Sequence, residues 1–445
     1  MTAKQPKAKK TFCIIAILIA FAAVLLFFIW VKDKTHTHFV SIFFAALSLA
    51  GVAALLASIL IPEKEFTPGE RTVRRDRIMI ILLVVITRIV TCLLGYCFLR
   101  LSDGIEGGLI ETLARTWRIG YGIDAPSYLG IAENGYVTSG DAMYHIVFLP
   151  FYPLCIKLVS FITGEYFYAG FIVSALCFAV SCILMYELTA MDHGRKAGMR
   201  SVRYLLLLPA AFFFALPMTE SLFLMLSLGC VYSARRNHIW AAGVIGMLAA
   251  FTRIQGVLLM VPIAFEYYKD RQKTVKWWTK HIAAVGIVGI GALGYLAVNY
   301  LLYGDAFQFM TFQREHWNQG FNPFYDTVHY ETEYLIGALR DGDIRSAFGL
   351  YLPCLLTVFG SLRIMLGVRR NLRRADTAYF VVYFILSIGS AWLLSAPRYM
   401  LAAYPLVIGL AASAKKPARD IEITLVLLSL QCAYLWMFVA GYPIY

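Results

Sequence analysis

Two carboxylates stand in "GIDAPSYLGIAENGY", one of the few long polar segments of a very apolar chain: Asp124 and Glu133. A carboxylate at a membrane surface can act as a general base toward a hydroxyl group. A second role fits the same pattern, because an Asp before "APSY" can cap a helix that has Pro in its first turn. On spacing alone the helix cap is the better-supported role of Asp124, and the two roles are compatible.

Three further ionisable residues stand within apolar sequence. Glu220 separates two apolar runs in "LPAAFFFALPMTESLFLML", where it suits either a site or the first turn of a helix capped by Thr219. Arg253 and Arg398 lie in "LAAFTRIQGVLLMVP" and "LLSAPRYMLAAYPL". Ionisable residues at membrane depth are costly, so function is the default hypothesis, with snorkelling to the interface as the alternative. A guanidinium group can also bind phosphate through paired hydrogen bonds. Arg88 in "VVITRIVT" is a weaker example of an ionisable residue within an apolar segment.

A fourth feature is the aromatic segment "YGDAFQFMTFQREHWNQGFNPFY". Its rings and amides, among them Gln313 and Trp317, suit sugar stacking and hydroxyl recognition. They suit an aromatic belt at a membrane interface equally well. The chain contains no P-loop, zinc or serine-triad signature.

Helices in a bilayer must position these residues. The chain has 445 residues, of which 60% are hydrophobic and 15% charged, and its mean hydropathy is +0.68. Continuous apolar runs such as Thr11–Val31 and Ile421–Tyr442 are long enough to span a membrane. They indicate an all-α polytopic membrane protein, and their continuity excludes a β-barrel. The first run is expected to be a retained span rather than a cleaved signal.

The net charge of +13 does not indicate nucleic-acid binding, because the basic residues lie in short loops, as the positive-inside rule requires. The nine Cys include no CxxC pair and are expected to be buried apolar residues. His36 and His38 in "THTH" lack further ligands for a metal.

Charge also predicts which loops share a side of the membrane. We expect the basic loops in the cytoplasm, namely "AKQPKAKK", Glu63–Arg77, Asp192–Arg203, Ser233–His238, Lys269–Lys280, Arg369–Arg374 and Lys415–Asp420. The opposite loops then lie outside, namely Ser102–His145, Thr219–Glu220, Thr252–Arg253, Tyr303–Arg345 and Ser395–Arg398.

This arrangement requires about thirteen spans, with several short central ones. Val147–Ile162 is expected to be an amphipathic helix at the outer interface. We expect residues 1–62 to form an appendage of two transmembrane helices, and residues 63–445 to form the main membrane domain.

Six segments together resemble the PIG-V-like mannosyltransferases, the family of GPI mannosyltransferase 2 and its bacterial relatives. In order, they are "IDAPSYLGIAENGY", "FLPFYPLCIKL", "LPAAFFFALPMTESLFLMLSLG", "AAFTRIQGVLLMVP", "YGDAFQFMTFQREHW" and "PRYMLAAYPL". The resemblance spans about Ile78 to Leu410 and leaves the two N-terminal spans outside. Family members often have an aromatic residue just before the Asp of the first motif and His or Trp shortly after it. Here Ile123 and Ser127 occupy those positions, which leaves the acceptor and the sugar open.

The resemblance implies a GT-C membrane glycosyltransferase that moves a sugar, with mannose expected, from a polyprenyl-phosphate donor to a glycan or glycolipid acceptor. It implies Asp124 as the general base of an inverting displacement on the extracytoplasmic face. Arg253 and Arg398 would bind the donor phosphate. The remaining pocket residues would be Tyr128, Glu133, Glu220, Gln313 and Trp317. No cofactor or obligatory metal is expected, and the expected location is a bacterial plasma membrane.

Two other functions fit a polytopic chain. A transporter or lipid-linked sugar flippase would carry inverted repeats and broken helices, and the chain shows no repeat. A catalytically inactive membrane partner would fit the departures at Ile123 and Ser127.

Overall fold

The computed structural model describes residues 5–32, 34, 37–61, 63, 66, 73–103, 108–117, 123–268 and 274–445. Within these ranges the chain is helical, with one isolated β-bridge between Phe321 and Ser390, which confirms the predicted all-α class. The α-helices are α1 (Gln5–Val31), α2 (Phe39–Ile59), α3 (Arg74–Asp103), α4 (Leu109–Thr116), α5 (Ala125–Asn134), α6 (Phe151–Thr163), α7 (Tyr166–His193), α8 (Arg195–Leu206), α9 (Glu220–Arg235), α10 (Ile239–Ala250), α11 (Met260–Tyr268), α12 (Val275–Tyr303), α13 (Gln308–Trp317), α14 (Phe324–Arg340), α15 (Ile344–Ser346), α16 (Leu352–Val368), α17 (Arg374–Ile388), α18 (Ala396–Tyr399), α19 (Tyr404–Ser413) and α20 (Pro417–Val439). Short 3₁₀ or π segments are η1 (Asp141–Val147), η2 (Ala211–Ala215), η3 (Ile254–Leu259), η4 (Ala347–Tyr351), η5 (Arg369–Asn371) and η6 (Met400–Ala402).

Seven helices in the described residues are long and apolar enough to cross a membrane, or eight if one bent pair counts as a span. The chain is therefore an integral membrane protein, but the predicted number of about thirteen spans is too high by this measure. The physical reason is that several apolar runs form short helices. The 16 residues of α9, for example, are about 24 Å long, less than the roughly 30 Å of the hydrocarbon core.

The segment predicted as an amphipathic helix does form a separate helix, α6, which bends by 110° from η1 before it. With 13 residues, α6 is about 20 Å long and too short to span the bilayer alone. It packs against α5 and α7, and so borders the segment that carries Asp124. Its position at the outer interface stays a prediction.

Close helix packing builds the centre of the molecule. The helix α10 packs against α9 and α12, and α7 packs against α8 and α9. Two glycines let α10 and α12 approach, because a Cβ at Gly243 would lie 2.5 Å from the Ala284 carbonyl oxygen and one at Gly291 would lie 2.1 Å from that of Met247.

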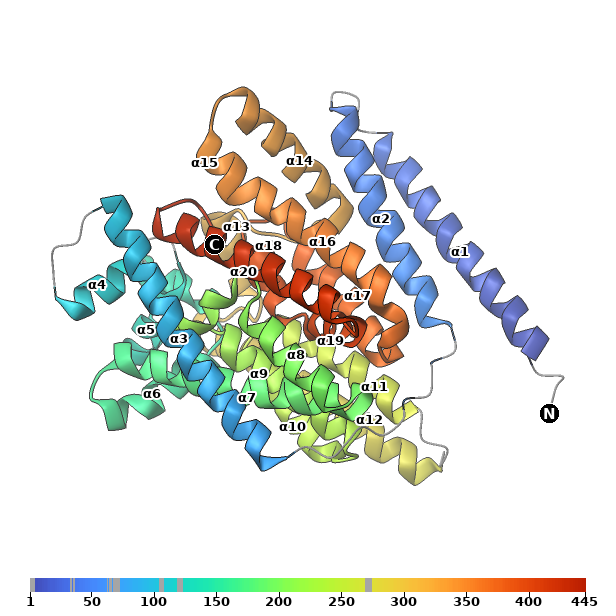
Figure 1. Ribbon diagram of the computed structural model, residues 1–445, viewed down its shortest axis with the longest axis horizontal. Coiled ribbons are helices and arrows are strands. Elements are labelled where there is room, and N and C mark those ends of the chain that lie inside the picture. The colour runs from blue at the N-terminus through green and yellow to red at the C-terminus, as the bar shows by residue number, and fades with distance from the viewer. Residues whose placement is uncertain are drawn as a thin grey trace.

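The two N-terminal helices lie side by side at one edge of the molecule (Figure 1). The helix α2 packs against α14, α16 and α17, and its buried residues include Leu49, Val52 and Leu55. The first span therefore contacts the rest of the molecule mainly through α2 and through its own C-terminal end, where Trp30 lies against α14.

A buried ionic network, the basic-loop network, joins loops that we predicted to share the cytoplasmic side. The Arg235 side chain is fully buried and lies 3.2 Å from Asp192, 3.2 Å from Glu266 and 2.6 Å from Asp376. Arg373 adds contacts of 2.5 Å to Asp192 and 3.1 Å to Glu266. Residues from three of the predicted basic loops thus meet in one cluster, as the charge-derived grouping requires.

Candidate functional site

Four charged side chains from loops predicted on the opposite side form a second cluster, the site cluster. The Asp124 Oδ2 atom lies 2.7 Å from Arg398 Nη1, and Arg398 Nε lies 3.5 Å from Glu220 Oε1. The same Glu220 oxygen lies 3.3 Å from Arg253 Nη2. Two carboxylates and two guanidinium groups therefore alternate, so their formal charges cancel. Residues more than 270 positions apart in the sequence meet here, which spacing alone could not predict.

Asp124 occupies the N-cap position of α5, with Pro126 in the first turn, as the sequence predicted. Its side chain nevertheless makes no capping hydrogen bond, because the residue has helical backbone angles (φ −77°, ψ −11°) and its carboxylate is turned toward Arg398. The helix-cap role favoured from spacing is therefore wrong for the side chain. The carboxylate belongs to the site cluster.

Glu220 is the first residue of α9, as predicted, and Thr219 at the N-cap makes no side-chain capping bond. The turn before it lies close to α7, where Gly170 leaves room for Pro217; a Cβ at Gly170 would lie 2.6 Å from the Pro217 Cβ. This close approach places the Glu220 carboxylate beside the two arginines. The position also suits the partial positive charge of a helix N-terminus.

The two arginines come from irregular segments between helices. Arg253 precedes η3, and Arg398 lies in the four-residue helix α18. Their guanidinium groups lie over aromatic rings: Arg253 is 6.0 Å and Arg398 is 5.8 Å from the centroid of Tyr399. Phe223 and Phe213 provide a second ring for each, at 5.8 and 5.9 Å. The rings hold the planar cations by stacking as well as by charge.

Burial divides the cluster into an inner and an outer part. The side chains of Glu220, Arg398 and Arg253 are 2%, 8% and 12% exposed, whereas that of Asp124 is 32% exposed. Desolvation alone would lower the pKa of Arg398, but the carboxylates of Asp124 and Glu220 outweigh it and raise that pKa well above its ordinary value. The arginine stays a cation, and the Asp124 carboxylate is the most exposed group of the cluster.

The inner part has unused hydrogen-bonding capacity. Glu220 Oε2, Arg253 Nη1 and Arg398 Nε are buried atoms that have no hydrogen-bond partner among the residues the structure describes. Such atoms are costly in an apolar interior, and a bound polar ligand would satisfy them. Two guanidinium donors fit an anion, and a carboxylate acceptor fits a hydroxyl group.

Aromatic rings link the site cluster to the predicted aromatic segment. Tyr128, one turn into α5, packs at 5.0 Å against Phe148, which lies 6.1 Å from Trp317. Burial, with the nearby charge of Asp124, raises the pKa of the Tyr128 hydroxyl well above its usual range. Tyr128 therefore stays neutral, and Trp317 is connected to the cluster through Phe148.

The remaining predicted pocket residues lie outside these contacts. Glu133 is exposed near the C-terminal end of α5, and Gln313 is half-buried in the middle of α13. Arg88 is also separate from the cluster; it donates to the Ala211 carbonyl oxygen at 3.3 Å and stacks on Phe178 at 4.1 Å. Any role for Glu133 or Gln313 stays a prediction.

Four aromatic residues of the site were not predicted from the sequence, namely Phe148, Phe213, Phe223 and Tyr399. Tyr399 follows Arg398 directly in "PRY". An aromatic residue next to an arginine in apolar sequence is a candidate to stack on its guanidinium group, so Tyr399 could have been predicted. Phe148 gave no local signal, since its importance comes only from lying between α5 and α13.

Metal ligands do not gather anywhere in the described part of the chain, where no group of three or more His, Cys, Asp or Glu side chains could hold an ion. His36 lies outside the described residues. His38 is paired with Glu333 at 2.6 Å.

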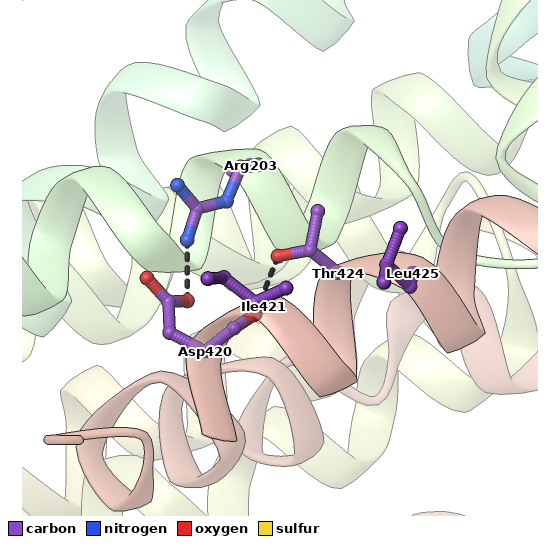
Figure 2. A pocket seen from close by; sticks show the side chains of 5 residues that line it. All are labelled: Arg203, Asp420, Ile421, Thr424 and Leu425. Carbon is purple, nitrogen blue, oxygen red and sulfur yellow. Dashed lines mark hydrogen bonds and ion pairs between the residues drawn. The ribbon is translucent and has the colours of Figure 1, made fainter. Parts of the chain in front are cut away.

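Figure 2 shows a separate cavity of about 160 Å³ between the end of α8 and the start of α20. Its lining residues are Arg203, Asp420, Ile421, Thr424 and Leu425. Arg203 and Asp420 in this lining form an ion pair, and Thr424 donates to the Asp420 carbonyl oxygen at 2.7 Å. The cavity contains none of the site-cluster residues and belongs to the end of the molecule with the basic loops.

Comparison with known proteins gave structural neighbours only. No family model matches the chain, and no curated protein matches it. Two crystal structures of ArnT from Cupriavidus metallidurans are similar, one bound to undecaprenyl phosphate and one in the apo state. Their sequence identities are 13% and 15% and their TM-scores 0.46 and 0.45. In both cases the match covers 77% of this chain and 62% of the ArnT chain.

Proposed function

We propose that this chain is a GT-C-type membrane glycosyltransferase. It would transfer a sugar, with mannose expected, from a polyprenyl-phosphate donor to a glycan or glycolipid acceptor. The observation that carries the proposal is the site cluster, in which an open carboxylate, Asp124, stands beside two buried guanidinium groups. The sequence resemblance to PIG-V-like mannosyltransferases supports the same chemistry and suggests the sugar.

In the proposed reaction Asp124 is the general base. Its carboxylate accepts the proton of the acceptor hydroxyl while that oxygen attacks the anomeric carbon of the donor sugar. The bond between this carbon and the phosphate oxygen breaks on the opposite face, which inverts the configuration. The products are the glycosylated acceptor and the free polyprenyl phosphate, and the proton remains on Asp124 until it passes to solvent.

The arginines have a distinct role in this proposal. The donor phosphodiester carries one negative charge, and the leaving phosphate gains a second as the bond breaks. Arg253 and Arg398 would stabilise this growing charge. The Nη1 atom of Arg253 supports the assignment, because this buried donor has no hydrogen-bond partner within the described part of the chain and could bind a phosphate oxygen.

The pocket walls are assigned by their position around the cluster. Glu220 contacts both arginines, and Tyr128 and Trp317 continue outward through aromatic contacts. We propose that this aromatic side receives the sugar or the acceptor, with Gln313 and Glu133 nearer its rim. The loops of the site would face the extracytoplasmic side of a bacterial plasma membrane.

A transfer assay tests the proposal. Purified protein is incubated with polyprenyl-phosphate-mannose and candidate acceptors, and the wild type is compared with Asp124→Asn. The amide keeps the size of the side chain but cannot accept the proton, so transfer is expected to fall by about 10²- to 10⁴-fold.

The matched control is Asp141→Asn, which removes an exposed carboxylate from the same stretch of loops. It should leave transfer unchanged. Transfer that survives Asp124→Asn would overturn the base assignment. Folded wild-type protein that transfers no sugar from any polyprenyl-phosphate donor would favour a transporter or an inactive partner instead.

A further inference from the structure

The helix α14 presents polar side chains along two neighbouring stripes, and each stripe binds a different part of the chain. Asp326, His329 and Glu333 form the first stripe, at a spacing of three and four residues that puts them on one face. Thr327 and Tyr330 form the second, one position further round the helix. In Figure 1 α14 lies beside α2, at the end of the molecule where α1 and α2 connect.

The first stripe binds the end of α1. The Trp30 Nε1–H donates to Asp326 Oδ1 at 2.8 Å, and Lys34 Nζ lies 2.9 Å from the same oxygen. The Trp30 ring also packs edge-on against His329 at 5.3 Å. The Lys34 and Asp326 side chains are only 27% and 23% exposed, so solvent screens this pair less than a surface ion pair.

The first stripe also binds the start of α2. The His38 backbone N–H donates to Glu333 Oε1 at 2.8 Å, and the His38 ring Nδ1 lies 2.6 Å from Oε2. The Ser41 hydroxyl donates to Glu333 Oε1 as well. His38 is the N-cap residue of α2 and makes no side-chain cap itself. Glu333 therefore supplies, from another helix, the carboxylate that a helix N-terminus favours.

The second stripe binds the loop that leads to Arg398. The Thr327 hydroxyl donates to the Ser390 carbonyl oxygen at 2.9 Å, and the Tyr330 hydroxyl approaches the same oxygen at 3.2 Å. The Leu393 N–H donates to the Tyr330 hydroxyl oxygen at 2.6 Å. This loop has little helical structure from Gly389 to Ser395, so these side chains take the place of helical hydrogen bonds.

Two further contacts fix the same loop. Gln319 donates its side-chain amide to the Trp392 carbonyl oxygen at 2.7 Å, and the Ala391 N–H donates to the Gly320 carbonyl oxygen at 2.8 Å. Arg398 follows within a few residues, after the N-cap residue Ser395 of α18. The hydrogen bonds from α14 therefore hold a loop that ends a few residues before Arg398.

We propose that α14 is a strut that transmits the position of the N-terminal hairpin, α1 and α2, to the loop carrying Arg398. Asp326 and Glu333 are its positioning residues. The helices α1 and α2, which the sequence predicted as part of an appendage, then belong to the structure that assembles the site cluster. This inference does not depend on the reaction that the site performs.

Hydrogen–deuterium exchange on the full chain in detergent or nanodiscs tests the strut. The variants are Asp326→Asn, Glu333→Gln and the double variant, which remove the charges but keep the side-chain size. Backbone amides of residues 389–398 are expected to exchange about 3- to 10-fold faster in the double variant, because the hydrogen bonds of the loop open more often. Segments of the basic-loop network, around Asp192 and Arg235, should exchange as in the wild type.

The matched control is Asp341→Asn, at the C-cap of the same helix, where the carboxylate is 70% exposed and lies 3.5 Å from Arg340 Nε. It should leave exchange in residues 389–398 unchanged. The conservative variant Asp326→Glu should restore slower exchange than Asp326→Asn. Faster exchange confined to α1 and α2 in the double variant would overturn the strut, as would an equal effect of Asp341→Asn.

Discussion

At the scale of single residues, the site cluster is poorly explained as a source of stability. Burying charged groups costs desolvation energy that their mutual attraction only just repays, and buried ion pairs are often replaceable by apolar residues. The buried Glu220 Oε2 and Arg253 Nη1 atoms of the cluster also find no hydrogen-bond partner in the segments that the structure describes. By contrast, the basic-loop network surrounds Arg235 with three carboxylates. The buried polar atoms without hydrogen bonds therefore indicate that the site cluster is a ligand site, whereas the basic-loop network is structural.

Glu331 gives a prediction at the same scale. Its side chain is fully buried in α14, and neither carboxylate oxygen makes a well-formed hydrogen bond with any residue described by the structure. Burial raises the pKa of this carboxyl well above its ordinary value of 4.5, more than the nearby Leu393 N–H lowers it. The folded protein therefore holds a proton on Glu331 that the unfolded chain releases above that value. This contribution to stability is complete below about pH 4.5 and is lost as the pH rises toward the folded pKa.

The variant Glu331→Gln, which carries no titrating group, tests this sign. Its thermal midpoint should equal that of the wild type near pH 4.5 and exceed it at pH 7–8 by on the order of 2–4 °C. Glu315→Gln, at an exposed position of α13, is the control and should show no such pH dependence. Parallel midpoint curves for Glu331→Gln and the wild type would contradict the prediction.

At the scale of elements, the site depends on breaks between helices. Asp124, Arg253 and Arg398 lie at or beside such breaks, and Glu220 begins a helix after one. Breaks of this kind expose backbone groups and need protein contacts to satisfy them at membrane depth. They are also the reason that fewer described helices than predicted are long enough to cross a membrane, because apolar runs of similar composition form both long helices and short broken ones.

The sequence predicted those features that depend on residues close together in the chain. The helical class, the grouping of the basic loops and the four charged residues of the site were all visible, because hydropathy and isolated charges are local features. The pairing of Asp124 with Arg398 was not visible, since it joins residues far apart in the chain. For the same reason the helix cap was preferred for Asp124: a cap is a local pattern and a distant ion pair is not.

A substitution at Gly256 tests whether η3 must pack closely against α10. It lies in η3 just after Arg253, and a Cβ there would lie 2.3 Å from both the Ala249 carbonyl carbon and the Ala250 nitrogen. Backbone atoms at the end of a helix cannot move aside as a flexible side chain can. The variant Gly256→Ala should therefore push η3 away from α10 and displace Arg253, at a cost of about 1–3 kcal/mol.

Thermal unfolding checks this cost, with Gly286→Ala as the control. Gly286 lies in the middle of α12, and nothing lies within 4 Å of a Cβ built there. Alanine is the better helix former, so the control midpoint should be equal to the wild type or higher. An unchanged midpoint for Gly256→Ala would show that the close approach of η3 to α10 is not required.

At the scale of the whole molecule, charged contacts separate into two groups that match the two predicted sides. The basic-loop network joins Asp192, Arg235 and Arg373, all from loops predicted in the cytoplasm. The site cluster joins Asp124 and Arg398 from loops predicted outside. Charge bias and three-dimensional contacts are independent observations, because the first counts residue types and the second measures distances. Their agreement supports a single orientation for the whole chain.

Labelling of single cysteines with a membrane-impermeant maleimide tests that orientation. In a variant without the nine natural Cys, Ser139→Cys and Lys196→Cys place one thiol each at exposed positions, in a predicted external loop and a predicted cytoplasmic loop. Ser139→Cys should react in intact cells and Lys196→Cys only in inverted vesicles, because the basic loop of the second resists translocation. Reaction of both cysteines from the same side would contradict the assignment of the two groups of loops to opposite sides. Reaction of Lys196→Cys alone in intact cells would show that the molecule has the opposite orientation, with the site cluster and its proposed polyprenyl-phosphate donor on the cytoplasmic face.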